Sequence, residues 1–264
     1  MEHNHTFVVC TYQESPYLEQ CLLSVLNQTV PTNVIISTST PNDHILGIAK
    51  KYNVPVFVNT GKTGIQEDWN FAIRQAKTDF VTVCHHDDYY YPTYAEEVLK
   101  IINKKKAVDK VLYIHTGYRD IDSEGKESVT KNTKVKRLLN FWMKFSCFQG
   151  NRFFKKRSLS LGNTVCCPSC TYNTKLLGFD FFDSEFTHCC DWDFYYKAAK
   201  MRGKAVYISK FCMAKRYHAG SQTSADIKSG KRVKEDYAMF CKFWPKWIAK
   251  LILRKYKKAY DINR

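Results

Sequence analysis

Short β-branched runs alternate with amphipathic segments along the first 115 residues, and this alternation constrains the fold more than any other feature of the chain. Runs rich in Val, Ile and Phe predict strands over residues 7–10, 34–38, 54–58, 80–84 and 110–115. Between them, apolar residues recur at helical spacing over residues 17–26, 43–52, 65–76 and 94–103. Strands that alternate with helices imply a mostly parallel sheet with helices on both faces, so the sequence predicts a three-layer α/β/α, Rossmann-like fold.

The second half of the chain is less regular. Residues 117–136 are polar and turn-like, and residues 138–148 are aromatic and apolar. Helical spacing returns over residues 191–199, and residues 205–208 predict a late strand. We therefore expect one α/β domain with two halves, residues 1–115 and 116–225, followed by a basic amphipathic helical tail over residues 226–264.

Composition limits the class of protein. With 264 residues, of which 44% are hydrophobic and 15% aromatic, the chain can bury a substantial core. The 11 cysteines are an odd number in a long chain whose first residues include no apolar signal segment, so we expect a reducing, cytoplasmic location. Because no apolar run approaches the roughly 20 residues of a membrane span, we expect a soluble protein or one peripheral on the inner membrane surface.

The formal net charge of +16 favours polyanionic partners: nucleotides, nucleic acid or an anionic membrane surface. Most basic clusters lie in the second half. Near the C-terminus, aromatic and aliphatic residues recur at helical spacing among lysines, as in Trp247, Lys250 and Leu251. This pattern is typical of a membrane-surface helix, and equally of a terminal helix packed on its domain with lysines in water.

The run 81–88, Val-Thr-Val-Cys-His-His-Asp-Asp, is the most informative local motif. An apolar strand that ends in polar residues presents them at the sheet edge where α/β enzymes bind ligands. Two adjacent carboxylates repel each other when ionised, and a cation relieves that repulsion. The run therefore predicts a divalent-metal site, with a solvated turn as the alternative.

Residues 8–28, VVCTYQESPYLEQCLLSVLNQ, resemble the first strand, nucleotide-contacting loop and first helix of family 2 glycosyltransferases with the GT-A fold. The resemblance is to the bacterial-type polysaccharide enzymes in particular, and it covers residues 6–224. It implies that Thr11, Tyr12 and Glu14 face the base and ribose of a nucleotide. An aromatic ring can stack on a base, and a carboxylate can accept hydrogen bonds from ribose hydroxyls.

Three further segments resemble the donor side of that family. The Asp-Trp-Asn helix at residues 68–70 implies that Asp68 contacts the nucleobase, although a helix N-terminus also favours a carboxylate through its dipole alone. The run 85–92, HHDDYYYP, is similar to the family's Asp-x-Asp-Asp turn, with His85 in place of the first Asp. The resemblance implies that Asp87 binds the donor nucleotide and a metal, with Asp88 as a further ligand. The run 216–223, RYHAGSQT, is similar to the family's late His-x-x-Ser segment and implies that His218 is another ligand of Mn²⁺ or Mg²⁺.

Residues 190–195, CDWDFY, are similar to the family's Glu-Asp-x-Asp-Leu motif at a helix start. The resemblance implies that Asp191 is the general base of an inverting transfer from a nucleotide-diphosphate sugar, most commonly a UDP-sugar, to a hydroxyl of a glycan or lipid-linked glycan. Cys190 replaces the usual Glu. The acceptor-side candidates are Cys190, Trp192, Asp193 and Ser169. An N-cap role for Asp191 is the structural alternative.

Other classes of protein explain part of the sequence. Cys167, Cys170, Cys189 and Cys190 have a spacing that permits a zinc site, with buried free thiols as the alternative. A basic nucleic-acid-binding protein accounts for the charge and the lysine-rich aromatic tail, but it leaves the carboxylate motifs unexplained. The replacements at His85 and Cys190 also fit a catalytically inactive GT-A-like binding module.

Overall fold

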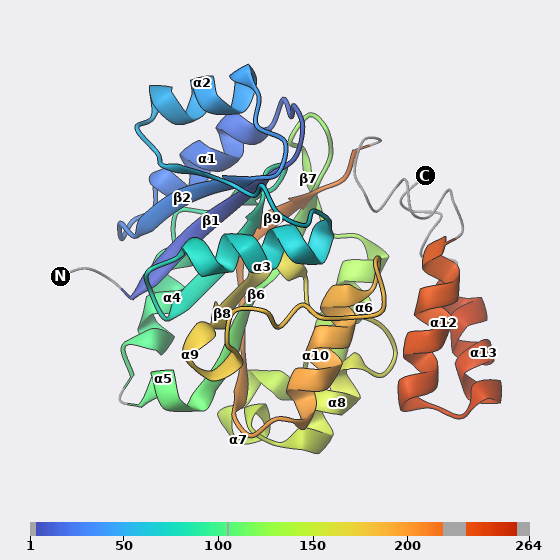
Figure 1. The fold of residues 1–264 in the computed structure, drawn as a ribbon. Helices are drawn as coiled ribbons and strands as arrows, with labels where there is room; N and C mark the ends of the chain where they lie inside the picture. The colour runs from blue at the N-terminus through green and yellow to red at the C-terminus, as the bar shows by residue number, and fades with distance from the viewer. Residues whose placement is uncertain (1–3, 105, 219–230, 258–264) are drawn as a thin grey trace.

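A computed structural model describes residues 4–104, 106–218 and 231–257 (Figure 1). Its centre is a sheet in the order β3-β2-β1-β4-β8-β6-β9-β5, with β7 paired to β6. The strands are β1 (His5–Thr11), β2 (Asn33–Thr38), β3 (Val56–Val58), β4 (Phe80–His85), β5 (Tyr89–Tyr90), β6 (Val111–Ile121), β7 (Glu127–Ser128), β8 (Cys170–Asn173) and β9 (Lys204–Arg216). The first four strands are parallel, and β8 runs antiparallel to both of its neighbours.

Helices cover both faces of this sheet (Figure 1). In the first half they are α1 (Leu18–Leu26), α2 (Asp43–Lys51), α3 (Ile65–Gln75), α4 (Tyr94–Ile102) and α5 (Ala107–Lys110). In the second half they are α6 (Lys131–Leu139), the short η1 (Trp142–Lys144), α7 (Ser146–Gln149), α8 (Arg152–Leu159), η2 (Cys167–Ser169), α9 (Thr174–Leu177), α10 (Cys190–Lys200), α12 (Lys231–Phe243) and α13 (Lys246–Tyr256).

Alternation along β1 builds two apolar cores. Phe7 and Val9 belong to one core with residues of α1, α2 and α4, and Val8 belongs to the other with residues of α3, α10 and α12. Side chains alternate across a strand, so each face of the sheet receives its own layer of helices. A large apolar side chain buried in this way contributes roughly 2 kcal/mol. The α/β fold with a mostly parallel sheet that the sequence predicts is confirmed.

The expectation for residues 117–136 is wrong in part. Strand β6 continues to Ile121 and α6 begins at Lys131, so only the segment between them contains turns. Tyr118 and Asp120 look polar in the sequence, but both are buried in β6, which pairs with β9 at both positions and with β7 at Asp120. Strand β9 is likewise longer than predicted, and it reaches Arg216.

The C-terminal helices α12 and α13 pack on the domain. Phe240 lies against Trp192 of α10 with ring centroids 5.1 Å apart, and the indole N–H of Trp244 donates to the carbonyl of Ser160 at 2.7 Å. Trp247 and Leu251 stay exposed on α13. Within the described ranges, none of the helices has the length and apolar character needed to cross a membrane.

Candidate active site

Three parallel strands end together at one edge of the sheet. Thr11 of β1 is in register with Thr38 of β2, and Cys10 is in register with His85 of β4. The loops that follow these strands therefore meet, which is the usual location of ligand sites in open α/β sheets.

The predicted nucleotide-contacting loop follows β1. Thr11 is buried, and its hydroxyl donates to the carbonyl of Ser37 at 3.3 Å. The Tyr12 side chain is 57% exposed, while its backbone N–H donates to His86 Nδ1 at 3.3 Å. Glu14 is exposed on the same loop. The ring of Tyr12 is thus open to a ligand, and its backbone is joined to the turn after β4.

Asp68 reaches the same region from the first turn of α3. Its Oδ2 accepts a hydrogen bond from Ser39 at 2.8 Å, and its Oδ1 accepts one from Asn59 at 2.8 Å. Both partners follow neighbouring strands, Ser39 after β2 and Asn59 after β3. Trp69 stacks on His85 with ring centroids 5.3 Å apart. Helix α3 therefore connects the predicted base-binding side to the carboxylate turn.

The carboxylate turn, residues 85–88, is the only group of metal-ligating side chains of this kind in the described ranges. One ligand atom from each of His85, Asp87 and Asp88 lies within 4.8 Å of the others. His85 Nδ1 is 4.0 Å from Asp88 Oδ2. His218, the second metal candidate, donates instead from Nε2 to Asp87 Oδ2 at 3.0 Å. The structure therefore adds His85 as a candidate ligand and places His218 beside Asp87.

The pKa values of the two carboxylates in the turn shift in opposite directions. Burial raises the pKa of Asp87, but the hydrogen bond from His218 and the charges of His85 and His86 outweigh burial and bring this pKa to about 2. For Asp88, burial and the charge of Asp87 raise the pKa well above its ordinary value. Burial lowers the pKa of His85 to about 4, so its ring is neutral at pH 7.

These residues fit a divalent cation. Asp88 Oδ2 and His85 Nε2 are buried and have no hydrogen-bond partner among the described residues, and burying such atoms unpaired is costly. Carboxylate oxygens and a neutral imidazole form a donor set that suits Mn²⁺ and suits Mg²⁺ less well. A cation there would also allow both carboxylates to ionise.

Arg216, to which the sequence assigned no role, fixes the carboxylate turn. It is buried, its Nε donates to the carbonyl of Asp87 and its backbone N–H donates to Asp88 Oδ1, both at 2.9 Å. Its Nη2 donates to Gln20 Oε1 at 2.6 Å, and its guanidinium lies 4.3 Å from the centroid of the Tyr17 ring. The available signal was a basic pair, Lys215 and Arg216, between the apolar stretch Cys-Met-Ala at 212–214 and His218.

Asp191 lies in the first turn of α10, whose N-cap position is Cys189, so Asp191 is not the N-cap. Its carboxylate accepts hydrogen bonds from Asn163 Nδ2 and from the backbone N–H of Trp192, both at 2.7 Å. Burial raises the pKa of Asp191 more than the nearby charges of Arg232 and Lys136 and these hydrogen bonds lower it. The result is a half-buried carboxylate that is more basic than an ordinary aspartate.

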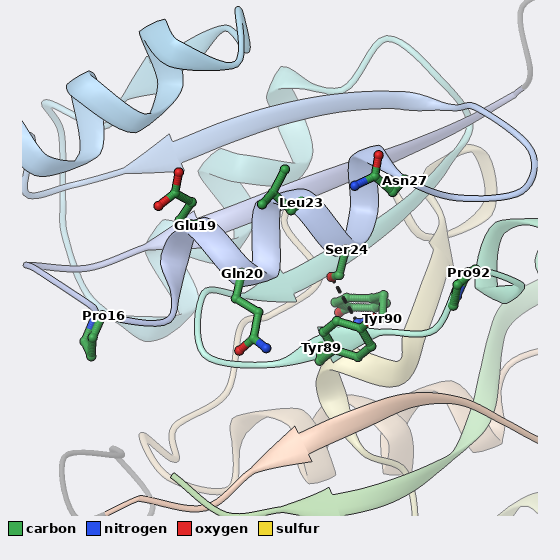
Figure 2. Close-up of a pocket in the computed structure, with 9 residues that line it drawn as sticks. All are labelled: Pro16, Glu19, Gln20, Leu23, Ser24, Asn27, Tyr89, Tyr90 and Pro92. Atoms are coloured by element: carbon green, nitrogen blue, oxygen red, sulfur yellow. Dashed lines mark hydrogen bonds between the residues drawn. The ribbon is translucent and has the colours of Figure 1, made fainter. Parts of the chain in front are cut away.

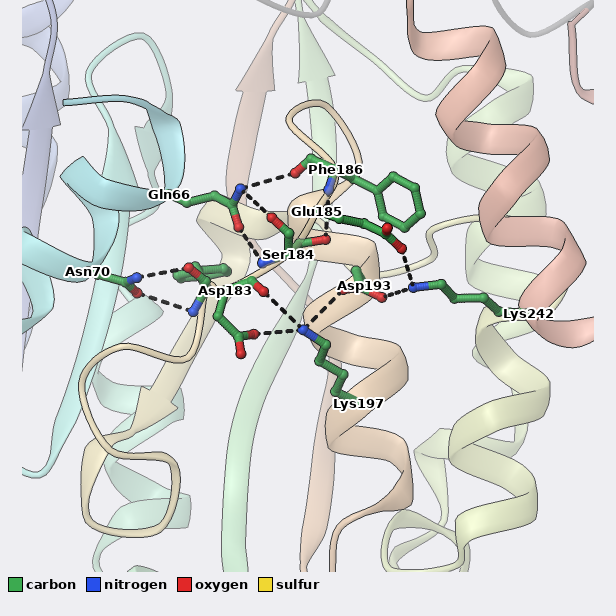
Figure 3. Close-up of polar contacts among 10 residues, drawn as sticks. Gln66, Asn70, Asp183, Ser184, Glu185, Phe186, Asp193, Lys197 and Lys242 are labelled. Atoms are coloured by element: carbon green, nitrogen blue, oxygen red, sulfur yellow. Dashed lines mark hydrogen bonds and ion pairs between the residues drawn. The ribbon is translucent and has the colours of Figure 1, made fainter. Parts of the chain in front are cut away.

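The other acceptor-side candidates are in the protein interior. Trp192 is buried and donates from its indole N–H to the carbonyl of Leu159 at 3.2 Å, and Ser169 donates to the carbonyl of Cys166 at 2.7 Å. Cys190 is buried at the start of α10. Asp193 is buried between Lys242 at 2.6 Å and Lys197 at 3.2 Å (Figure 3). Among the described residues, none of these four side chains forms a hydrogen bond or an ion pair with the carboxylate turn.

The four cysteines of the zinc hypothesis do not come together as metal ligands in the described part of the chain, where His85, Asp87 and Asp88 form the single such group. Cys167 lies 3.5 Å from the hydroxyl of Tyr172, and Cys189 donates to Asp236 at 3.2 Å. All four thiols are free and buried, so the structure favours the alternative of buried free thiols.

A pocket of about 400 Å³ lies beside the carboxylate turn, between α1 and the segment around β5 (Figure 2). In its wall, the backbone N–H of Tyr90 donates to the hydroxyl of Ser24 at 3.1 Å. Gln20, which accepts the hydrogen bond from Arg216, also lines it. None of the site residues predicted from the sequence lines this pocket.

Residues 6–171 match the family described as Glycosyl transferase family 2. The chain is 23% identical over 236 residues to the uncharacterized glycosyltransferase YwdF of Bacillus subtilis (strain 168), covering 86% of this chain and 80% of YwdF. It is 24% identical over 225 residues to an uncharacterized glycosyltransferase of Rickettsia typhi, covering 84% of this chain and 66% of that protein.

Two solved structures resemble the fold at low sequence identity. TarS of S. aureus in complex with UDP-GlcNAc has a TM-score of 0.59 at 16% identity, over 97% of this chain and 71% of TarS residues 1–349. The mannosyltransferase PcManGT from Pyrobaculum calidifontis, in complex with GDP-Man and Mn²⁺, has a TM-score of 0.63 at 14% identity, over 97% of this chain and 70% of PcManGT. At such identities the similarity is one of fold.

Proposed function

Because this chain belongs to glycosyltransferase family 2 and has the GT-A fold, we propose that it moves a sugar from a nucleotide-diphosphate donor to a hydroxyl acceptor, with inversion at the sugar carbon. The observation that carries the proposal is the meeting of Tyr12, Asp68 and the carboxylate turn at one sheet edge. The complexes of TarS with UDP-GlcNAc and of PcManGT with GDP-Man support a nucleotide-sugar donor, and we take a UDP-sugar as the first candidate.

The donor binds, in this proposal, to the half formed by residues 1–115. The exposed ring of Tyr12 stacks on the base, and Thr11, Glu14 and Asp68 line the base and ribose side. His85, Asp87 and Asp88 would hold Mn²⁺ or Mg²⁺, and such an ion, when bound, supplies positive charge to the diphosphate leaving group. His218 orients Asp87 through its hydrogen bond at 3.0 Å.

The acceptor binds to the half formed by residues 116–225. Asp191 accepts the proton of the acceptor hydroxyl while that oxygen bonds to the anomeric carbon, and the bond from that carbon to the diphosphate oxygen breaks. The electron pair of the broken bond leaves with the nucleoside diphosphate. Asn163 holds one carboxylate oxygen of Asp191, and Arg232 and Lys136 keep the ionised form accessible despite burial. We take the acceptor to be a glycan or lipid-linked glycan.

Calorimetric titration of nucleoside diphosphates into the purified protein, with Mn²⁺ and then with a chelator, tests this function. We expect selective binding of one nucleotide in the presence of Mn²⁺, lost with chelator and in Asp87→Ala. The matched control is Asp109→Ala, which removes an exposed carboxylate that the structure pairs with Lys175 at 3.7 Å. Unchanged nucleotide affinity in Asp87→Ala would place the donor site elsewhere.

A further inference from the structure

An exposed aromatic cluster covers the region of η1, α7 and the start of α8. The exposed fractions are 42% for Phe141, 50% for Trp142, 48% for Phe145 and 67% for Phe153. We call these four residues the aromatic cap. Large apolar side chains that are exposed together mark a surface that another molecule covers.

The rings of the cap form one connected surface. Phe141 lies 5.4 Å from Trp142 and 5.8 Å from Phe145, measured between ring centroids. Phe153 joins them through the half-buried Phe154, whose centroid is 5.4 Å from that of Phe153 and 6.0 Å from that of Trp142. Because their contacts are mostly edge to face, the rings support one another as a hydrophobic projection.

The segment that contains the cap carries charge of one sign. No Asp or Glu occurs between Glu127 and Asp180, while this segment contains ten basic residues: Lys131, Lys134, Lys136, Arg137, Lys144, Arg152, Lys155, Lys156, Arg157 and Lys175. Of these, Lys144, Arg152 and Lys156 are exposed close to the cap in the chain. Aromatic side chains flanked by lysine and arginine are the composition that binds the headgroup region of anionic bilayers.

We propose that the aromatic cap is a docking surface for an anionic phospholipid membrane. The inference goes beyond the transfer reaction and differs from the sequence expectation, which put membrane contact on the C-terminal tail. Basic residues near an anionic surface are attracted to it electrostatically, and rings that insert among the headgroups add apolar burial.

The position of the cap keeps the donor site in water. Gly150, at the end of α7, lies next to Lys204 at the start of β9, and the last residue of β9, Arg216, holds the carboxylate turn. The 13 residues of β9 span about 40 Å at roughly 3.3 Å per residue. Figure 1 shows α7 and β7 at opposite ends of the sheet. A membrane at the cap therefore leaves the carboxylate turn open to a water-soluble nucleotide.

Two other occupants fit the surface less well. A second copy of the chain in a two-fold dimer would bring two basic surfaces together with no acidic residue of this segment to compensate them. Single-stranded nucleic acid stacks its bases on ring faces, and the edge-to-face contacts of Phe141 with Trp142 and Phe145 cover part of those faces.

Flotation with vesicles tests the proposal without nucleotide or acceptor, so its failure is distinct from failure of the proposed transfer. Wild type is compared on vesicles of equal parts phosphatidylglycerol and phosphatidylcholine and on phosphatidylcholine alone. The test variant is Trp142→Ala/Phe145→Ala/Phe153→Ala, and the matched control is Trp247→Ala/Leu251→Ala on α13. All five side chains are exposed, and circular dichroism melts check that both variants are folded.

We expect wild type to bind the anionic vesicles, the cap variant to bind them at least tenfold more weakly, and the control to bind as wild type does. No binding of wild type to anionic vesicles would overturn the proposal. So would loss of binding in the α13 control with retention in the cap variant. Tighter binding to a single-stranded RNA oligonucleotide, with the same dependence on the cap and no competition by vesicles, would assign the surface to nucleic acid instead.

Discussion

Arg216 donates from Nε to the carbonyl oxygen of Asp87 at 2.9 Å, so a residue at the end of β9 fixes the turn after β4. The backbone N–H of Arg216 also donates to Asp88 Oδ1 at 2.9 Å. A third hydrogen bond, to Gln20, joins the same guanidinium to α1. The carboxylate turn thus depends on two distant segments.

Replacing Arg216 by lysine should weaken metal-dependent nucleotide binding. Lysine keeps the positive charge, but it lacks the planar guanidinium with which Arg216 donates to the Asp87 carbonyl and to Gln20 Oε1 at the same time. Loss of a group that orients metal ligands typically costs 10–100-fold in affinity, and we expect a loss of about that size by calorimetry with Mn²⁺. Lys210→Ala, which removes an exposed cation of the same strand, is the control. Equal affinities in wild type and Arg216→Lys would show that the turn holds its shape without this residue.

His85→Asp should change the metal preference of the site. The neutral imidazole suits Mn²⁺ better than Mg²⁺, and an aspartate would give the site a third carboxylate, which Mg²⁺ accepts. We expect the ratio of nucleotide affinity with Mn²⁺ to nucleotide affinity with Mg²⁺ to fall about tenfold or more, because substitutions around a metal site typically change affinity by 10–100-fold. His44→Asp on α2 is the control. An unchanged ratio in His85→Asp would mean that His85 is not a ligand.

Asp191→Asn should abolish transfer while donor binding stays intact. Asparagine nearly preserves the shape of the side chain but cannot accept the acceptor proton, and general-base catalysis typically contributes 10²–10⁴-fold. We expect kcat to fall by about that factor, with nucleotide affinity within about twofold of wild type. Asp193→Asn, two residues along the same helix, is the comparison. If Asp193→Asn lost transfer and Asp191→Asn kept it, the base assignment would move to Asp193.

The fall of kcat/KM at low pH should follow the protonation of Asp191. Burial raises its pKa, and the charges of Arg232 from α12 and Lys136 from α6, with the hydrogen bond from Asn163, oppose that rise. The base works only when ionised, so kcat/KM should fall as the pH drops through a pKa above the ordinary aspartate value. Arg232→Gln removes one opposing charge and should move this fall in kcat/KM to higher pH. A fall that stays in place or moves to lower pH in Arg232→Gln would contradict the assignment.

Local pattern predicted strands β1 to β4 and helices α1 to α4 in the first half of the fold, but not the short β5 and α5. The strands that contain Val8 and Val83 were predicted because each combines β-branched residues with a polar end, and the side chains of Val8 and Val83 are fully buried. Strand β8 was missed because Cys170–Asn173 is short and polar, yet it is buried between β4 and β6. Its burial depends on long-range pairing, which local pattern does not encode.

The candidate site also contains residues that local motifs predict and partners that they do not predict. Asp87 and Asp191 stood out because each belongs to a compact local motif, and their roles remain predictions. The partners that fix them, Arg216 and Asn163, lie 129 and 28 residues away along the chain. Asp193 shares the motif of Asp191, but its buried pairing with Lys242 comes from packing of the C-terminal helix.

Asn70→Ala should destabilise the protein strongly although residue 70 lies outside the proposed chemistry. Its buried amide donates to the carbonyl of Phe182 at 2.8 Å and accepts from the Phe182 N–H at 3.1 Å, and so joins α3 to the loop before α10 (Figure 3). Alanine leaves both backbone groups buried and unpaired, at a cost of about 3 kcal/mol in the free energy of unfolding. Urea unfolding measures this loss. Gln75→Ala removes a half-buried amide that donates to the carbonyl of Phe71 within α3, and should change the same free energy by less than about 0.5 kcal/mol. Equal effects of the two substitutions would show that the loop is held by Gln66 and apolar packing rather than by Asn70.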